Sequence, residues 1–406
     1  MPETVSVDVV VVGARCAGSA VAMLLARQGH KVLVVDQATF PSDNKMSTLL
    51  IWHQGVDLLK SWGLLEKLQR AGTPLLTEFT LDLGQIVLRG HPPGTKVHAA
   101  IAPKRIVLDK TLVDAATAAG AELRQGVSFQ EVVKDASGRV TGIRCRKADG
   151  DTLVVNAKCV VGADGRLSDV ARAVGSTGYH EFPREKCSTN IYAFYSGVNT
   201  DGAEFYSGPE RMAYAWRTND DQVITGLIVP GREERSSRAE LETMVLEDFG
   251  TMAPRLAARL REGRRVTEWL RVSIPTGCRT ASGPGWALVG DAGLTFDPVT
   301  AAGMTNAFRD AGYLADALHG ALTGERSIDE ALADYAQKRD ASAVQWHLFA
   351  QQMAELAPPT EDIIKLFVAL AGNQAQTDRY FGVFGQTVTP GDFFGPENMA
   401  RLFSGS

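Results

Sequence analysis

A glycine-rich turn near the N-terminus is the first feature of this sequence that could do chemistry. Its residues are Gly13-Ala14-Arg15-Cys16-Ala17-Gly18. They follow the G-x-G-x-x-G spacing of dinucleotide-binding turns, with arginine in place of the middle glycine. Such a turn lets a diphosphate approach the backbone amides at a helix N-terminus. Asp36 ends the next apolar run, where a carboxylate accepts hydrogen bonds from an adenosine ribose and repels a 2′-phosphate. The turn therefore predicts a site for a plain adenosine dinucleotide, either NAD or FAD.

Residues far along the chain distinguish between these two cofactors. The apolar run 286–289 leads into Gly290 and Asp291, and this carboxylate could bind a ribityl hydroxyl. Gly303 and Met304 then stand at the start of a long helical segment. A helix N-terminus at this point would direct positive amides at the pyrimidine edge of a reduced, anionic flavin. These features favour FAD over NAD.

The elements that must position these residues form an α/β pattern. The β-branched run 5–12, a helix over 18–28 and a second apolar run over 31–36 predict a β-α-β unit. Alternating aromatic and polar residues over 188–229 predict antiparallel strands instead. We therefore expect a Rossmann-like FAD-binding domain with a parallel sheet, interleaved with an antiparallel β-sheet substrate domain and C-terminal helices.

Chain length and the order of the elements predict a discontinuous organisation. The 406 residues are about twice what one hydrophobic core usually organises. We expect the FAD-binding domain to comprise residues 1–75, 101–178 and 268–335. The substrate-binding β-sheet domain would comprise 76–100 and 179–267, followed by a C-terminal helical region over 336–406.

Composition excludes several classes of protein. With 45% hydrophobic and 22% charged residues and a net charge of −5, the chain is globular and shows no sign of a nucleic-acid partner. We expect no membrane span, because no apolar run approaches the roughly 18 residues that a span needs. The start of the chain has no leader pattern, so we expect a cytoplasmic protein. The five cysteines are scattered along the chain, and no two histidines have the spacing of metal ligands. We therefore expect no disulfide and no metal site.

Four motifs in order resemble the FAD-dependent monooxygenase and geranylgeranyl-reductase superfamily, whose members share the para-hydroxybenzoate hydroxylase type of fold. The motifs are the glycine turn, Arg105 with the following Leu108-Asp109, the turn over 162–165 and the block over 290–310. The resemblance implies that Arg105 contacts the FAD diphosphate or ribityl region and that Asp164 lies near the dinucleotide. It also implies that Asp291 binds the ribityl chain and that residues 303 and 304 lie beside the isoalloxazine.

The turn and the resemblance together define the expected cofactor-binding residues. They are Gly13, Ala14, Arg15, Cys16, Ala17, Gly18, Asp36, Gln37, Arg105, Asp164, Asp291, Pro298, Gly303 and Met304. No second glycine fingerprint marks a nicotinamide domain, and members of this superfamily commonly receive hydride from transiently bound NADH or NADPH.

The chain departs from the aromatic hydroxylases of this superfamily at the second block. Those enzymes carry G-D-A-A-H and P-P-x-x-G-Q-G-x-N, whereas residues 290–294 read GDAGL and residues 297–305 read DPVTAAGMT. The Asp-Pro element instead resembles flavin-dependent halogenases and geranylgeranyl reductases. A halogenase should also show W-x-W-x-I-P. Ile274-Pro275 is present, but Leu270 and Val272 occupy the tryptophan positions, which argues against halogenation.

The leading functional hypothesis is an NAD(P)H-dependent monooxygenase that hydroxylates a small apolar or aromatic organic molecule. The reaction would proceed through a flavin C4a-hydroperoxide, which survives only in a dry pocket. The alternative is a flavin-dependent reductase or dehydrogenase of a carbon–carbon double bond. A halogenase and a binding protein without flavin are less favoured, and the intact glycine turn and Asp291 oppose the latter.

Candidate substrate and catalytic residues complete the prediction. Five aromatic residues could line one face of a sheet and form an apolar pocket, or simply pack a core: Tyr192, Phe194, Phe205, Tyr214 and Trp216. Lys45 could contact the flavin or orient a peroxide, and Asp297 could lie near the pyrimidine, with a solvated lysine and a turn before proline as the alternatives. We expect Cys16 to be a small buried filler and His53 to be structural or solvated. No acid or base is assigned.

Overall fold

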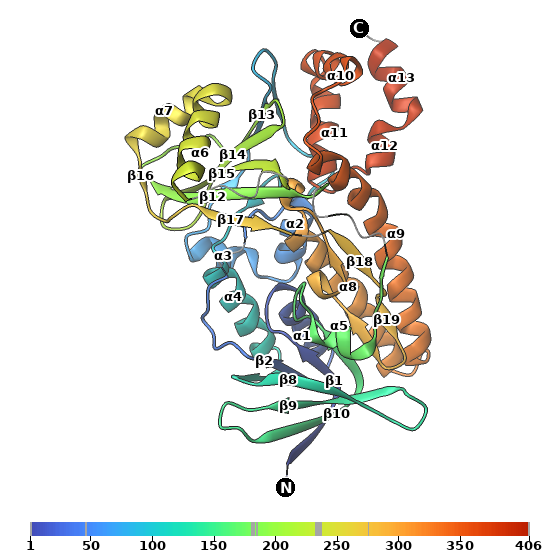
Figure 1. The fold of residues 1–406 in the computed structure, drawn as a ribbon. Helices are drawn as coiled ribbons and strands as arrows, with labels where there is room; N and C mark the ends of the chain where they lie inside the picture. The colour runs from blue at the N-terminus through green and yellow to red at the C-terminus, as the bar shows by residue number, and fades with distance from the viewer. Residues whose placement is uncertain are drawn as a thin grey trace.

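The computed structural model describes residues 2–44, 47–179, 183, 186–231, 238–274 and 276–404. Within these residues the chain forms two large β-sheets, helices that cover them and a group of C-terminal helices (Figure 1). This arrangement confirms the predicted α/β fold with a parallel sheet, an antiparallel sheet and C-terminal helices.

The first sheet has a parallel centre built from distant parts of the sequence. Its strands are β1 (Glu3–Val12), β2 (Val32–Asp36), β7 (Glu122–Gln125), β8 (Ser128–Lys134), β9 (Val140–Arg146), β10 (Thr152–Gly162), β19 (Ser282–Gly283) and β20 (Trp286–Leu288). The order is β19-β20-β10-β1-β2-β7, with β9 pairing both β10 and β8. β1 lies parallel to β2 and β10, and β10 lies parallel to β20. Val9, Val10 and Val11 are fully buried, as a β-branched strand covered on both faces requires.

The parallel direction of these strands positions the site. The carboxyl ends of β1, β2, β10 and β20 meet at one edge of the sheet. Gly13 follows β1, Asp36 ends β2, Ala163 follows β10 and Val289 follows β20. Ligands of open α/β sheets bind at this edge.

The second sheet is mainly antiparallel. Its strands are β4 (Phe79–Asp82), β5 (Val87–Gly90), β12 (Ser188–Ser196), β13 (Ala203–Gly208), β14 (Arg211–Arg217), β15 (Gln222–Pro230), β16 (Arg264–Arg265) and β17 (Leu270–Ser273). The order is β16-β12-β15-β14-β13-β4-β5, with β17 also pairing β12. One face packs into a core with the C-terminal helices. The other face is covered by α6 (Arg238–Met252) and α7 (Pro254–Glu262).

Helices cover the parallel sheet and connect it to the second sheet. α1 (Cys16–Arg27), α4 (Arg105–Ala118) and α8 (Gly303–Leu322) share one core on one face of the parallel sheet. The other helices are α2 (His53–Ser61), α3 (Leu65–Arg70), α5 (Asp169–Val174), α9 (Ile328–Ala354), α10 (Glu361–Ala371), α11 (Gln374–Phe384), α12 (Pro390–Phe394) and α13 (Pro396–Ser404). α9 contacts β19 at one end and α12 at the other, so it carries the chain from the first sheet to the second (Figure 1).

Two element boundaries differ from what the sequence pattern predicts. The pattern over 239–260 predicts one helix, but Ala253 separates α6 from α7, because Pro254 begins α7 at a position where no backbone N–H is needed. The first helix is predicted over 18–28, whereas α1 spans Cys16–Arg27 and so begins inside the glycine-rich turn. In the described part of the chain, no helix has the length and apolarity needed to cross a membrane.

Candidate functional site

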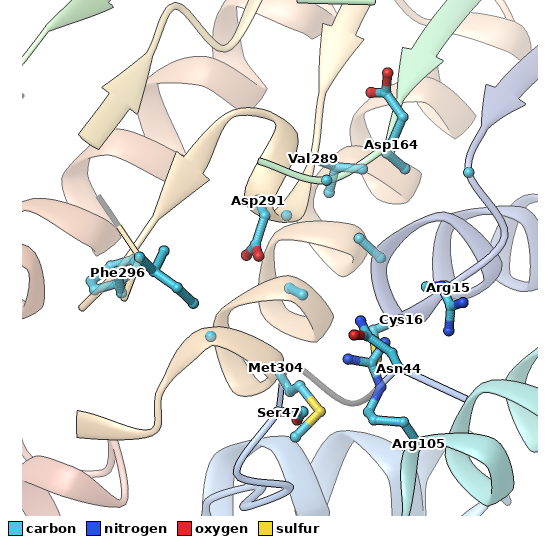
Figure 2. Close-up of a pocket in the computed structure, with 18 of the residues that line it drawn as sticks. Arg15, Cys16, Asn44, Ser47, Arg105, Asp164, Val289, Asp291, Phe296 and Met304 are labelled. Carbon is cyan, nitrogen blue, oxygen red and sulfur yellow. The ribbon is translucent and has the colours of Figure 1, made fainter. Parts of the chain in front are cut away.

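A cavity of about 440 Å³ opens at the carboxyl ends of the parallel strands (Figure 2). Segments separated by nearly 300 residues line it together, from Val12 to Ala307. All but two of the expected cofactor-binding residues lie on its wall, namely Gly13, Arg15, Cys16, Ala17, Asp36, Gln37, Arg105, Asp164, Asp291, Pro298, Gly303 and Met304. The two predicted ends of one cofactor site are therefore joined by a single cavity.

Ala14 and Gly18 are the two expected residues that do not line the cavity. The Ala14 amide donates a hydrogen bond to Asp36 Oδ2 at 2.7 Å and so ties the turn to β2. A Cβ on Gly18 would lie 1.8 Å from the Gly13 carbonyl oxygen. Gly13 itself has a φ of +105°, and a Cβ there would lie 2.4 Å from the Ala163 carbonyl oxygen. These two glycines therefore permit the close packing of the turn against the start of α1 and against Ala163.

Two helices present uncapped N-termini to the cavity. Arg15 precedes α1 and Ala302 precedes α8, and neither makes a side-chain cap hydrogen bond. Neither helix has an acidic residue in its first turn. The first amides of a helix lack intrahelical partners and carry partial positive charge. The cavity therefore offers donors to an anionic group at both helices, which suits a diphosphate at α1 and a reduced flavin ring at α8.

Two arginines on the cavity wall share one buried carboxylate. Arg105 donates to Asp109 through Nε and Nη2 at 3.0–3.1 Å. Arg15 donates to the same carboxylate at 2.5 Å and to Ser42 Oγ at 3.1 Å. Asp109 has no solvent exposure. Sequence reasoning noted Asp109 only as part of a motif, although its i,i+4 spacing from Arg105 on a helix could have predicted the pair.

Asp291 projects into the cavity from the short 3₁₀ helix η3 (Gly290–Ala292), directly after β20 (Figure 2). No described residue donates a hydrogen bond to its carboxylate. The side chain of Asp291 is exposed to the cavity, and desolvation by the surrounding protein raises its pKa, while Arg105 and Arg166 act in the opposite direction. A carboxylate without a protein partner at this place fits the hydroxyl groups of a ribityl chain.

The other carboxylates along the cavity already have backbone partners. Asp36 accepts from the amides of Ala14 and Ala38 at 2.7 and 2.8 Å, which leaves lone pairs for a ribose. Asp164 accepts from Ser168 Oγ and from the first amides of α5, and Figure 2 shows its carboxylate turned away from the middle of the pocket. Asp164 therefore lines the larger cavity, but its carboxylate stabilises the turn before α5.

Of the two catalytic candidates, Asp297 lies within the described residues and Lys45 does not. Asp297 is 1% exposed and accepts from the Ser188 amide at 2.6 Å, from Ser188 Oγ at 2.5 Å and from the Val299 amide at 3.0 Å. Burial raises its pKa, whereas these hydrogen bonds lower it. Asp297 thus fixes the 3₁₀ helix η4 (Pro298–Thr300) to β12. Lys45 lies outside the described residues.

Burial determines the protonation of the Cys16 thiol and of the His53 imidazole. Burial raises the pKa of Cys16 to about 12, with Arg105 acting in the opposite direction, so the thiol is protonated at neutral pH. His53 is 1% exposed, and burial lowers its pKa to about 3. Among the described residues, no group of three or more His, Cys, Asp or Glu side chains could hold a metal ion.

A second cavity of about 140 Å³ lies on the far side of η4. It is lined by Trp52, Leu81, Leu83, Phe205, Ser207, Met212, Val299, Met353, Phe367, Tyr380, Phe381 and Phe384. Consecutive residues separate the two cavities, because Pro298 lines the larger and Val299 the smaller. The wall between them is therefore thin.

One face of the second sheet roofs both cavities. A row of paired residues crosses the sheet from Val272 through Asn190 and Ile228 to Met212. Val272 and Asn190 line the larger cavity, and Met212 lines the smaller. A ligand that packs against this face could therefore extend from one cavity into the other.

The five aromatic residues expected at the substrate lie in one apolar cluster but have separate positions. Tyr192 lines the larger cavity and Phe205 the smaller. Phe194, Tyr214 and Trp216 line neither, and the Tyr214 and Trp216 rings stack with centroids 4.3 Å apart. Both the cavity and the core interpretations thus apply to this set.

Sequence reasoning missed several residues that line the larger cavity. They include Asn44, Ser47, Thr48, Asn190, Val272, Ile274 and Phe296. Alternation along β12 could have placed Asn190 on the face of Tyr192. Val272 and Ile274 occupy positions of the W-x-W-x-I-P pattern of halogenases, of which this chain keeps only Ile274-Pro275. Asn44, Ser47 and Thr48 of the loop after β2 belong to no sequence motif that would mark them as binding residues.

Comparisons with known proteins agree with this geometry. A family model described as an FAD binding domain matches residues 6–350. Menaquinone reductase of Mycolicibacterium smegmatis is 29% identical over 321 residues, which cover 73% of this chain and 72% of the relative. Kynurenine 3-monooxygenase of Salinispora tropica is 28% identical over 360 residues, which cover 82% and 76%. The flavin-dependent brominase Bmp2 has a similar fold, with a TM-score of 0.80 at 18% identity, covering 99% of this chain and 98% of that chain.

The matches with the first three curated relatives span 60%, 80% and 72% of each relative's own length. The family match, in contrast, spans most of this chain and includes every segment that lines the larger cavity. With uncapped helix ends and an unpartnered carboxylate in one elongated cavity, the residues present fit the diphosphate, ribityl and ring portions of the cofactor. The chain belongs to the FAD binding domain family and is an FAD-dependent oxidoreductase.

Proposed function

We propose that this protein is an NAD(P)H-dependent monooxygenase that hydroxylates a small apolar or aromatic organic molecule. The observation that carries the proposal is the pairing of the two cavities across Pro298 and Val299, beneath one face of the second sheet. Leu50 and Trp52 repeat this arrangement, with Leu50 on the larger cavity and Trp52 on the smaller. The FAD site is thus adjacent to an apolar chamber that is suited to a substrate.

The lining of the smaller cavity favours oxygen chemistry. None of the described residues that line it is an acid, a histidine, a lysine or an arginine. The indole N–H of Trp52 already donates to the Thr300 carbonyl oxygen at 2.8 Å. An apolar chamber excludes water, which would otherwise destroy a reactive oxygen species before it met the substrate.

The proposed reaction balances as a monooxygenation. A substrate C–H bond, O2, NAD(P)H and one proton become C–OH, NAD(P)⁺ and water. Bound FAD would supply the redox chemistry by accepting hydride and activating O2. One oxygen atom enters the new C–O bond, and the other leaves as water.

The chain itself contributes binding and orientation. The α1 amides, Arg15 and Arg105 would hold the diphosphate, and Asp291 would accept from the ribityl hydroxyls. The α8 amides would stabilise negative charge on the reduced ring. Tyr192 and Asn190 of β12 would pack against the flavin ring in the larger cavity.

A second candidate is a flavin-dependent reductase of a carbon–carbon double bond. The similarity to menaquinone reductase and the retained Asp297-Pro298 element favour it. This reaction would add a hydride and a proton across the double bond and would need no oxygen. The same apolar cavity could hold such a substrate.

Oxygen dependence separates the two candidates. The purified protein should show a flavin spectrum that NADH or NADPH bleaches without oxygen. A panel of small aromatic compounds is then screened for compounds that stimulate oxygen uptake. The reaction is repeated with isotopically labelled O2 to trace the oxygen atom of the product. A monooxygenase incorporates one labelled atom into the product and does not turn over anaerobically. Anaerobic turnover with saturation of a double bond would instead establish the reductase.

A further inference from the structure

We propose that the Tyr380 hydroxyl is a substrate-orienting group of the smaller cavity, which selects a ring compound carrying one oxygen substituent. The inference rests on the proposed function in taking this cavity as the substrate site. Tyr380 lies in α11, within the C-terminal helical region. It lines the cavity together with Phe381 and Phe384 of the same helix.

The hydroxyl of Tyr380 lacks a protein partner. The side chain is 7% exposed, and none of the described residues hydrogen-bonds its hydroxyl, which is not fully enclosed by protein atoms. Other buried tyrosines are satisfied: Tyr335 donates to the Leu288 carbonyl oxygen at 2.7 Å, and Tyr214 donates to Asn190 Oδ1 at 2.9 Å. A buried phenol usually finds a partner. A ligand oxygen in the cavity would supply the one that Tyr380 lacks.

The ring of Tyr380 is held in place by other aromatic rings. Its centroid lies 5.8 Å from that of Phe367, 6.0 Å from Phe381, 5.5 Å from Phe384 and 5.6 Å from Phe393. These rings come from α10, α11 and α12, and all four contacts are edge-on or tilted. Little freedom is then lost when the hydroxyl bonds a ligand, so the interaction gains from preorganisation.

The charge state and the size of the site define the ligand. Burial raises the pKa of Tyr380, so the phenol stays protonated and can donate as well as accept. No described lining residue carries a charge that would attract an ionised ligand. The volume of about 140 Å³ is close to that of an engineered apolar cavity of ~150 Å³ that binds benzene. A neutral six-membered ring with one hydroxyl or carbonyl oxygen satisfies these conditions.

A matched pair of probes tests the inference on the full-length, FAD-loaded protein. Phenol and toluene have nearly the same shape and differ by a hydroxyl in place of a methyl group. Their dissociation constants are measured by ligand-observed NMR for the wild type and for Tyr380→Phe. We expect the preference for phenol over toluene to fall about tenfold in the variant, with toluene binding unchanged, because one hydrogen bond is lost. An unchanged preference, or no binding of either probe, would overturn the proposal.

Tyr335→Phe is the control, because it removes a hydroxyl that has a protein partner and lines neither cavity. It should lower the melting temperature and leave the phenol preference intact. Tyr380→Phe should keep or raise the melting temperature, since no protein hydrogen bond is lost. Equal destabilisation by both substitutions would show that Tyr380 has a protein partner and would overturn the inference. Failure of the proposed monooxygenation appears separately, as anaerobic turnover.

Discussion

Arg105 and Asp109 form a buried ion pair across one turn of α4, with three hydrogen bonds of 3.0–3.1 Å. Arg15 of the glycine turn reaches the same carboxylate from the other side. Asp109 has no solvent exposure, whereas Arg15 and Arg105 both line the larger cavity. One buried carboxylate therefore holds two arginines on the wall where we propose that the diphosphate binds.

Asp109→Asn should lower the free energy of unfolding by about 3 kcal/mol, because two guanidinium groups lose their buried counter-charge. Urea denaturation of the apoprotein measures this loss, and FAD titration should show weaker binding as both arginines leave their positions. Asp114→Asn is the matched control, since Asp114 pairs with Lys110 at the same i,i+4 spacing on α4 but with side chains 58% and 43% exposed. An exposed pair contributes less than about 1 kcal/mol. Similar losses in the two variants would contradict the role of Asp109.

Asp291→Ala should weaken FAD binding by about 10- to 100-fold, the range for one hydrogen bond to a charged group. The stability of the apoprotein should not fall, because no described residue hydrogen-bonds this carboxylate. Flavin fluorescence titration and thermal unfolding of the apoprotein check the two halves of the prediction. An Asp291→Ala variant that binds FAD as tightly as the wild type would remove Asp291 from the site.

The fold could be predicted because its signals are local. The β-branched run of β1 and the apolar run before Asp291 each specify a strand buried on both faces, and parallel strands must bring their carboxyl ends to one edge. Gly13, Asp36 and Asp291 therefore meet in one cavity, as their positions after these strands require. Pattern and turn chemistry were sufficient for this part of the site.

The partners of the carboxylates could not be predicted, because they come from distant segments. Asp291 and Asp297 are six residues apart, yet only Asp297 is engaged, by Ser188 from the other sheet. The smaller cavity poses the same difficulty. Its walls join residues around Trp52, the second sheet and the Tyr380 helix, and no motif marks any of them. Such assemblies depend on tertiary packing rather than on periodicity.

Gly18→Ala should destabilise the apoprotein, because the added Cβ would overlap the Gly13 carbonyl oxygen at the start of α1. The loss should equal or exceed the roughly 1–3 kcal/mol typical of overpacking. Gly303→Ala, at the start of α8, adds a Cβ with no atom within 4 Å and should leave apoprotein stability unchanged. Denaturant unfolding of both apoproteins makes the comparison. If Gly18→Ala were as stable as Gly303→Ala, the close contact of the turn would be disproved.

His53 should make stability depend on pH below neutrality. Its folded pKa of about 3 lies below the ordinary value of 6.5, mainly because of burial, so between these values the unfolded chain binds the extra proton. Stability is therefore fully present above pH 6.5 and falls as the pH drops, by up to about 1.4 kcal/mol per pH unit from this group. We measure the free energy of unfolding by urea denaturation at roughly pH 7 and pH 5. Between these values the free energy of unfolding should fall by about 2 kcal/mol less in His53→Leu than in the wild type. A His53→Leu variant with the full wild-type slope would show that His53 is protonated in the folded state.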